Sequence, residues 1–433
     1  MNQPMNGTLA LWYESTADPN PDDQVDARAA ADAGTEAGGR DKTAAGERAV
    51  ASEDTGASEE LGASEEVGGP IVPPLVRLHV NLWRDIGKKF NFLDIGFHLE
   101  ETADLDRLYL YLPAPIEIAS IYDLSNALKD ADTLNAVFNE VAAVEREADE
   151  HFIIKTDTGR RIIHHVDPAR DISVLPVPIP GRPCGTTITL KSGLCARINN
   201  PKNRAPQHYV RLRIFLHGDA QNLFTTEDGA TSLGLSLTQD VLETTEFRLN
   251  ERRSFPHVIL ERAGKGQVRL ESVHYFLIRS KNHQLGSQHQ NFRKVRHLEP
   301  DIWTSYLRVG QPALRRWSGK PRADGMIIYQ WRAIARKDKV TNNPVYLDDF
   351  IAYASFRIAK DKILAYFVAA LAIGGVGSAL LNVGLSGLAW FLSIIERGPY
   401  GIGVSNLITG IILGMLALTP MWFSKLKRWW RKR

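Results

Sequence analysis

Cationic side chains that could bind phosphate are concentrated in one part of the chain. Residues 279–297 hold eight Arg, Lys or His side chains, and further cations follow at 315–322 and 332–339, interleaved with Trp and Tyr. Guanidinium groups bind phosphate in a bidentate way, and aromatic rings stack on nucleobases. This composition predicts a site for a nucleotide or an oligonucleotide, with a solvated basic surface, or one resting on anionic lipid, as the alternative. The candidate ligand-binding residues are Arg293, Lys294, Arg296, Arg315, Arg316 and Arg332.

Local motifs for other chemistry are missing from the sequence. His164 and His165 are adjacent, whereas a zinc protease needs two histidines one helical turn apart. The segment 264–266, Gly-Lys-Gly, lacks the Ser or Thr and the upstream glycine of a phosphate loop. We therefore expect no catalytic residue, no metal and no cofactor, although a catalytic set dispersed along the chain would escape this kind of search.

The C-terminal part of the chain has the composition of a membrane anchor. Residues 363–395 contain no charged side chain, apolar sequence resumes at 398–424, and residues 425–433 are strongly basic. A charge-free apolar run of more than about 18 residues is typical of a membrane span. We therefore expect a two-helix transmembrane hairpin over 363–424, followed by a basic cytosolic tail. Basic residues flank both expected spans on one side, which places both termini in the cytosol.

Small and weakly polar residues recur at every fourth position in this region. Gly374, Ser378 and Asn382 form one such series, and Gly410 and Gly414 form another. Small residues with this spacing let helices approach closely in lipid, and an Asn facing acyl chains is costly. These five residues are therefore the candidates for helix packing or pore lining. The alternative is that the two helices simply pack on each other.

The rest of the chain divides by composition. Residues 1–70 carry 15 acidic and 4 basic side chains and are rich in Ala and Gly, so we expect a disordered acidic tail. The apolar triplet at 11–13 within it is a candidate docking motif or a chance feature. A cytosolic α+β domain is expected over 71–350, with prolines that mark a candidate lobe boundary near 172–184. Residues 351–362 are expected to be a linker.

The expected domain is rich in β-strands, with a few helices. Residues 76–82 alternate apolar and polar side chains, as a half-buried strand does. Residues 152–164 read as a hairpin around an Asp-Thr-Gly turn, and residues 326–335 as a late strand. Apolar spacing predicts helices within 120–145 and 233–249.

The order of these parts resembles that of the two-transmembrane-helix effector proteins of bacterial anti-phage defence. The resemblance covers the succession of a sensor-like domain, a hairpin and a basic tail, the last two within 362–433. It implies a homo-oligomer in the bacterial inner membrane, in contact with anionic lipids, that forms a membrane-disrupting pore. It also implies a nucleotide or oligonucleotide signal made by a separate partner enzyme. A tethered binding adaptor without pore activity, and a membrane-anchored enzyme acting on nucleic acid or lipid, remain the alternatives.

Overall fold

The computed structural model describes most of the chain, which divides into two compact units. Unit 1 comprises residues 1–228 and 242–357, and unit 2 comprises residues 229–241 and 358–433. The described residues are 7–17, 71–84, 91–181, 183–200, 207–228, 241–289, 291–310, 323–358 and 363–396.

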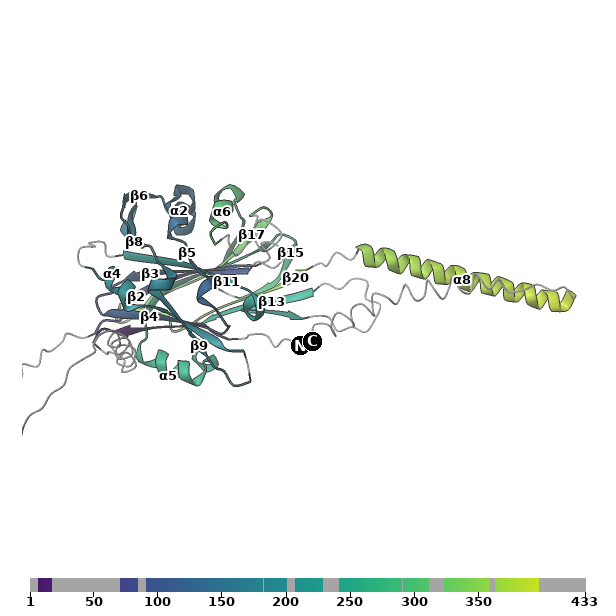
Figure 1. Ribbon diagram of the computed structural model, residues 1–433, viewed down its shortest axis with the longest axis horizontal. Helices are drawn as coiled ribbons and strands as arrows, with labels where there is room; N and C mark the ends of the chain where they lie inside the picture. Colours follow the sequence, from purple (N-terminus) through teal and green to yellow (C-terminus); the bar gives the residue numbers. More distant parts are fainter. Residues whose placement is uncertain are drawn as a thin grey trace, which may run out of the picture. The chain divides into compact units, whose positions relative to one another are not determined.

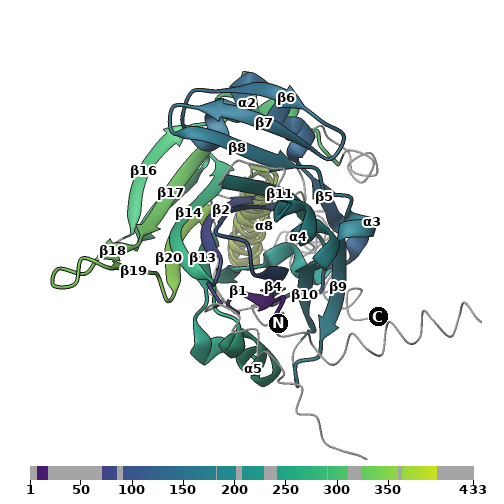
Figure 2. The same ribbon diagram turned by 90° about the vertical axis from the view of Figure 1, so that its left-hand side faces the viewer.

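The largest element of unit 1 is a sheet of ten described strands, several of which lie side by side in Figure 2. In spatial order, nine of them are β16 (Phe292–His297), β17 (Met326–Ile334), β14 (Arg269–Ser280), β2 (Leu75–Trp83), β3 (Asn91–Glu100), β11 (Gln207–Leu216), β8 (Gly159–His164), β7 (His151–Thr156) and β6 (Ala142–Glu147). The tenth, β5 (Ile121–Asp123), pairs with β11. Most neighbours are antiparallel, but β14 runs parallel to β2, and β8 parallel to β11.

Alternation of side chains gives this sheet two different faces. In β2, Val76, Leu78 and Val80 are fully buried in the main core, whereas Arg77 and His79 point to the other face. Successive side chains of a strand point to opposite faces, so this pattern follows directly from the sequence. The strand predicted over residues 76–82 is confirmed.

Two smaller sheets share the main apolar core with the first face of the ten-stranded sheet. One contains β1 (Ala10–Ser15), β4 (Leu105–Leu112), β10 (Gly185–Leu190) and β9 (Ile172–Val177). The other contains β12 (Thr225–Asp228), β13 (Val241–Leu249), β20 (Phe350–Ile358) and β15 (His283–Gln288). The short strands β18 (Arg336–Lys337) and β19 (Pro344–Val345) pair only with each other among the described strands.

Short helices pack on the second face of the ten-stranded sheet and against the sheet that contains β1. Figure 1 shows α2 (Ala131–Phe138) and α6 (Pro300–Tyr306) together on one side of the unit, with α5 (His257–Lys265) on the opposite side. Helices α3 (Pro168–Asp171) and α4 (Ser192–Ile198) complete the described helices of unit 1. Two apolar clusters, one under α2 and one under α6, fix these helices on the second face.

Three assignments made from composition are wrong within unit 1. Residues 10–15, expected in the disordered tail, form β1, and Leu11 and Trp12 are buried between other elements. Most of the expected linker, 351–358, belongs to the buried strand β20. The helix expected over 233–249 is a strand, β13, from Val241 onward. In each case partner strands far away in sequence supply the burial, which composition alone does not reveal.

The predicted fold class, an α+β domain followed by a two-helix transmembrane hairpin, is wrong. The described chain is rich in strands, and the described part of unit 2 is chiefly one helix, α8 (Ile363–Glu396). Among the described residues, no helix has the combination of length and hydropathy that a membrane span requires. The second expected span, 398–424, lies outside the described residues.

The predicted localisation in the inner membrane, with two spans, is therefore wrong as well, as is the ion channel that those spans were expected to form. The prediction relied on the absence of charged side chains. A low number of charged side chains is typical of a span, but it does not define one, because the summed transfer free energy of all the residues decides. Residues 363–395 include Gly, Ser and Asn among the apolar side chains.

Candidate functional site

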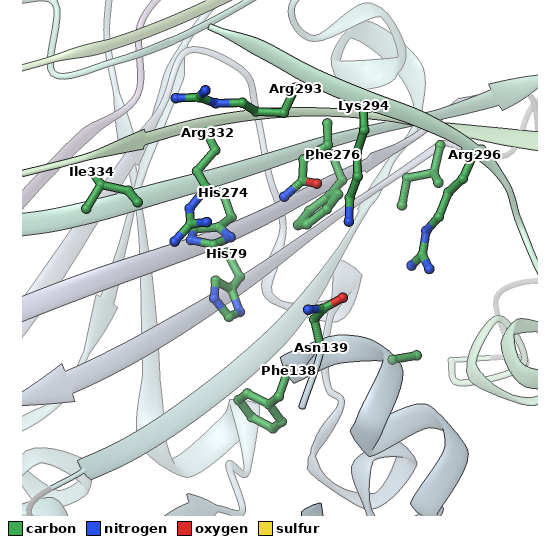
Figure 3. Close-up of a pocket in the computed structure, with 13 residues that line it drawn as sticks. His79, Phe138, Asn139, His274, Phe276, Arg293, Lys294, Arg296, Arg332 and Ile334 are labelled. Atoms are coloured by element: carbon green, nitrogen blue, oxygen red, sulfur yellow. The ribbon is translucent and has the colours of Figure 1, made fainter. Parts of the chain in front are cut away.

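A cavity of about 580 Å³ opens on the second face of the ten-stranded sheet, between four strands and the end of α2. Figure 3 shows its lining side chains, which come from β2, β14, β17 and β16 on one side and from α2 on the other. The lining residues are His79, Ala136, Phe138, Asn139, His274, Phe276, Arg293, Lys294, Arg296, Ile328, Gln330, Arg332 and Ile334. We call this cavity the cationic pocket.

Strand register builds one row of polar side chains across the floor of the pocket. His274 of β14 is paired with Arg332 of β17 on one side and with His79 of β2 on the other. Residues that are paired across neighbouring strands share a face, so these three side chains lie next to one another. The imidazole centroids of His79 and His274 are 5.1 Å apart. Two histidines separated by 195 positions in the chain thus become neighbours.

A bulge in β16 places two consecutive cations at the rim. Phe292 pairs with Trp331 and Lys294 pairs with Gln330, so Arg293 is an extra residue without an opposite partner. A bulge of this kind breaks strict alternation and re-aims side chains. In Figure 3, Lys294 extends toward the end of α2, while Arg293 runs along the rim. Both side chains therefore line the pocket, which regular alternation would not allow.

The cations of the pocket are largely uncompensated. Arg296 lies 3.5 Å from the carboxylate of Glu299, and both side chains are exposed. Among the described residues, no carboxylate lies within ion-pair distance of Arg293, Lys294 or Arg332. Like charges that are held close together without a counter-ion attract anions from solution. The pocket therefore has the electrostatics of an anion-binding site.

Burial and the neighbouring cations keep both histidines of the floor neutral. Burial, followed by the charge of Arg332, lowers the pKa of His274 to about 4. Burial, followed by His274 and Arg211, lowers the pKa of His79 well below its usual value. A neutral imidazole still donates one hydrogen bond and accepts another. Within the described ranges, no three His, Cys, Asp or Glu side chains converge as metal ligands do.

The end of α2 forms the roof of the pocket. The N-cap of the helix is Asp130, whose carboxylate accepts a hydrogen bond of 2.9 Å from the Thr133 amide. The C-cap is Asn139, which has a φ of 54° and an N–H that donates to the Asn135 carbonyl. Asn tolerates this left-handed conformation better than other side chains. The cap thereby fixes the positions of the Phe138 ring and the exposed Asn139 amide above the floor.

Beside the floor, on the same face of the sheet, a hydrogen-bonded network of fully buried polar groups, which we call the arginine network, holds the sheet and α6 together. Asp94 accepts two hydrogen bonds from Arg213, of 2.8 and 2.9 Å, and one from the Tyr306 hydroxyl at 2.8 Å. Arg211 donates through Nε to the Tyr306 hydroxyl and through Nη1 to the Tyr209 hydroxyl, both at 2.8 Å. In contrast to the pocket, each buried charge in this network has partners.

Four of the six ligand-binding residues predicted from composition line the same pocket. They are Arg293, Lys294, Arg296 and Arg332. Arg315 and Arg316 lie outside the described residues. Whether the four bind a ligand stays a prediction.

The residues predicted for helix packing or pore lining fall elsewhere. Gly374, Ser378 and Asn382 lie in α8 of unit 2, and a Cβ added at Gly374 would meet nothing within 4 Å. Gly410 and Gly414 lie outside the described residues.

Sequence reasoning missed the polar groups of the pocket that carry no permanent charge. These are His79, His274, Asn139 and Gln330. A signal was present for two of them, because His79 and Gln330 are polar positions in strands whose alternation is visible in the sequence. That His79 and His274 meet depends on the parallel pairing of β2 with β14, for which the sequence holds no local signal.

Comparisons with known proteins identify no family for this chain. No family model matches the sequence, and no curated protein matches it significantly. Among solved structures, yeast LTA4 hydrolase in complex with Bestatin is similar, with a TM-score of 0.21 and 11% sequence identity. That similarity covers 65% of this chain and 28% of the hydrolase, so this chain spans less than a third of that protein's length. A similarity this weak says nothing about the activity of this chain.

Proposed function

We propose that unit 1 binds a nucleotide-type ligand in the cationic pocket, with phosphate on the cations of β16 and β17 and a nucleobase toward the roof. The observation that carries the proposal is the convergence of Lys294, Arg332 and Arg293 on one cavity without carboxylate partners among the described residues. All three side chains are exposed at the pocket, and cations held close together without a counter-ion create a positive potential that attracts an anion from solution.

The size of the pocket supports a small ligand. Its volume of about 580 Å³ lies within the range of roughly 300–1,000 Å³ that small-molecule sites occupy. A mononucleotide, or the end of an oligonucleotide, fits such a volume. Both ligands would present a phosphate and a nucleobase to the pocket, and a comparison of probes of different length distinguishes them.

The uncharged groups of the pocket support the nucleobase. Phe138 at the roof and Phe276 on the floor supply aromatic surface, and the amides of Asn139 and Gln330 each offer donors and an acceptor. Base recognition commonly combines stacking on aromatic rings with hydrogen bonds to base edges. Inorganic phosphate would use only the cationic side of the pocket.

Calorimetric titration of the full chain at low salt tests the proposal, with adenosine 5′-monophosphate, a linear adenine dinucleotide and inorganic phosphate as probes. We expect both nucleotides to bind more tightly than phosphate. Lys294→Met and Arg332→Met should each weaken nucleotide binding by about tenfold or more, because charge-assisted hydrogen bonds to phosphate are lost. Asn139→Gly, which keeps the left-handed backbone accessible, should reduce the preference for nucleotide over phosphate.

Lys155→Met is the matched control for these substitutions. Lys155 is an exposed lysine of β7, outside the pocket lining. If this variant loses as much affinity as Lys294→Met, binding depends on net charge and not on the pocket. If none of the probes binds the wild-type chain at millimolar concentration, the proposal is wrong.

A role in anti-phage defence stays a prediction. It rested on an order of parts that included the transmembrane hairpin.

A further inference from the structure

The arginine network reaches the floor of the cationic pocket through one tyrosine. The Tyr209 hydroxyl accepts a hydrogen bond of 2.8 Å from Arg211 Nη1 and lies 3.4 Å from His79 Nδ1. Tyr209 is fully buried, whereas His79 lies on the pocket lining. A continuous path of hydrogen bonds thus runs from Asp94 through Tyr306, Arg211 and Tyr209 to His79.

Chemistry sets the direction of the three hydrogen bonds that lead from Asp94 to Tyr209. A guanidinium group only donates, and an ionised carboxylate only accepts. Tyr306 therefore accepts from Arg211 and gives its proton to Asp94, at 2.8 Å in each case. Tyr209 likewise accepts from Arg211, so its own proton is available for His79 Nδ1. Among the described residues, no other acceptor for that proton is recorded.

A glycine makes the close approach of these groups feasible. Gly96 of β3 lies between His79 of β2 and Arg211 of β11 in the same cross-strand row. A Cβ at this position would lie 2.1 Å from the Tyr209 hydroxyl and 3.1 Å from Arg211 Nη1. Any other residue would therefore displace the hydroxyl from its place between Arg211 and His79.

We propose that Tyr209 holds His79 in the neutral tautomer that carries its proton on Nε2, so that His79 serves as an uncharged hydrogen-bond donor to a phosphate oxygen of the ligand. This inference rests on the proposed function for its ligand, but the tautomer itself is a property of the ligand-free protein. Tyr209 is in this sense a positioning residue, and His79 is the residue that contacts the ligand.

An uncharged donor at this place has a definite consequence for selectivity. The Nε2–H group donates and does not accept, so it favours acceptors such as phosphate oxygens over ligand groups that donate. It also adds no charge next to Arg211, whose proximity would disfavour a further cation. The pocket can therefore add a directional contact to phosphate without increasing the repulsion among its own cations.

Nitrogen-15 NMR of the histidine-labelled full chain reads the tautomer directly, without ligand. We expect the His79 signal, assigned by its loss in His79→Gln, to show an unprotonated Nδ1 and a protonated Nε2. In Tyr209→Phe, which removes only the hydroxyl, the two nitrogens should become mixed or exchange roles. A protonated Nδ1 in the wild-type protein would overturn the inference, as would a tautomer that does not respond to Tyr209→Phe.

Two amide substitutions at position 79 separate the two nitrogens in a binding measurement. The glutamine amide nitrogen takes the place of imidazole Nε2, and the asparagine amide nitrogen takes the place of Nδ1. We therefore expect His79→Gln to bind adenosine 5′-monophosphate within about threefold of wild type, and His79→Asn to lose about tenfold. The reverse order would overturn the inference.

The two measurements also distinguish this inference from the proposed function. If the tautomer is as expected but neither adenosine 5′-monophosphate nor inorganic phosphate binds the wild-type chain, the proposed function fails while the role of Tyr209 stands. If the nucleotide binds but the tautomer is the opposite one, only this inference fails. Thermal unfolding of each variant shows whether a loss of binding reflects a loss of structure.

Discussion

Two groups of cationic side chains in unit 1 are only a few side chains apart but have opposite surroundings. Arg213 is fully buried and makes two hydrogen bonds to Asp94, at 2.8 and 2.9 Å. Arg332 and Lys294 line the cationic pocket, where no carboxylate among the described residues neutralises them. The first group is satisfied by the protein itself, and the second is left for a partner from outside.

The difference teaches how to tell structural from functional cations. A buried charge is tolerated only when it is paired and hydrogen-bonded, so the partners of Arg213 are part of the fold. Cations at an open cavity retain water and can stay unpaired at modest cost. Removing the acidic partner of the first group should therefore lower the free energy of unfolding. Removing a cation of the second group should leave the free energy of unfolding unchanged.

The largest effect is expected from Asp94→Asn in the arginine network. The substitution leaves Arg213 buried without a compensating charge, which typically lowers the free energy of unfolding by about 3–5 kcal/mol. Urea unfolding followed by circular dichroism measures the change. Glu117→Gln, at an exposed position, is the control and should stay within about 0.5 kcal/mol of wild type. Equal stability of the two variants would contradict the comparison.

A smaller effect on the free energy of unfolding is expected from a change in pH, and it arises from His274 in the cationic pocket. The folded-state pKa of His274 is about 4, below the ordinary value near 6.5 for the unfolded chain. The unfolded state therefore binds the proton first, and the contribution of His274 is complete above pH 6.5 and is lost as pH falls toward 4. The slope is at most about 1.4 kcal/mol per pH unit for such a group.

Urea unfolding at pH 7, 6 and 5 checks this expectation. His208, which stacks on His164 outside the pocket, also has its pKa lowered to about 4 by burial, so part of the slope should persist in any pocket variant. His274→Asn should flatten the profile relative to wild type. An unchanged profile would show that His274 does not titrate as the structure indicates.

Lys294→Met and Arg332→Met should barely change stability. We expect the free energy of unfolding to stay within about 0.5 kcal/mol of wild type, or to rise slightly because like charges are removed. The same variants are expected to lose nucleotide affinity, so the two measurements together separate function from stability. A loss of several kcal/mol in either variant would place that residue among the structural cations.

The smallest effect on binding is expected at Arg296. Its guanidinium already lies 3.5 Å from the exposed carboxylate of Glu299, an arrangement worth about 0–1 kcal/mol. Arg296→Ala should therefore weaken nucleotide binding by no more than about threefold, measured in the same titration as Lys294→Met. An effect as large as that of Lys294→Met would show that the ion pair with Glu299 does not keep Arg296 from binding the ligand.

Parts of the fold could be predicted from the sequence because they follow from local alternation. The strand at 76–82 and the hairpin at 152–164, which pairs β7 with β8, are confirmed. The strand expected at 326–335 is also confirmed as β17. The helix expected over 233–249 is wrong from Val241 onward, since Val241–Leu249 alternates buried and less buried side chains with a period of two. The spacing of apolar residues in this segment fits both the period of a helix and that of a strand. In the structure the segment pairs with β12 and is therefore a strand.

The candidate site was predictable only for its permanent charges. Composition drew attention to Arg293, Lys294 and Arg332, but it did not show that a bulge and strand register bring them to one cavity. His79 could not be linked to His274 from the sequence, because their contact depends on pairing between distant strands. The membrane hairpin was predicted from the absence of charged side chains, and that prediction is wrong because none of the described helices qualifies as a membrane span.

The bulge at Arg293 has a further consequence, for how molecules of this protein behave toward one another. Among the described strands, β16 stands at the end of the ten-stranded sheet, and an edge strand offers unpaired backbone groups to a second chain. A bulge and a run of cations are two devices that prevent such edge-to-edge pairing. The residues proposed to bind the ligand therefore also prevent this edge strand from pairing with a second molecule. Neutral substitutions at several of them at once should lower solubility even where each molecule remains correctly folded.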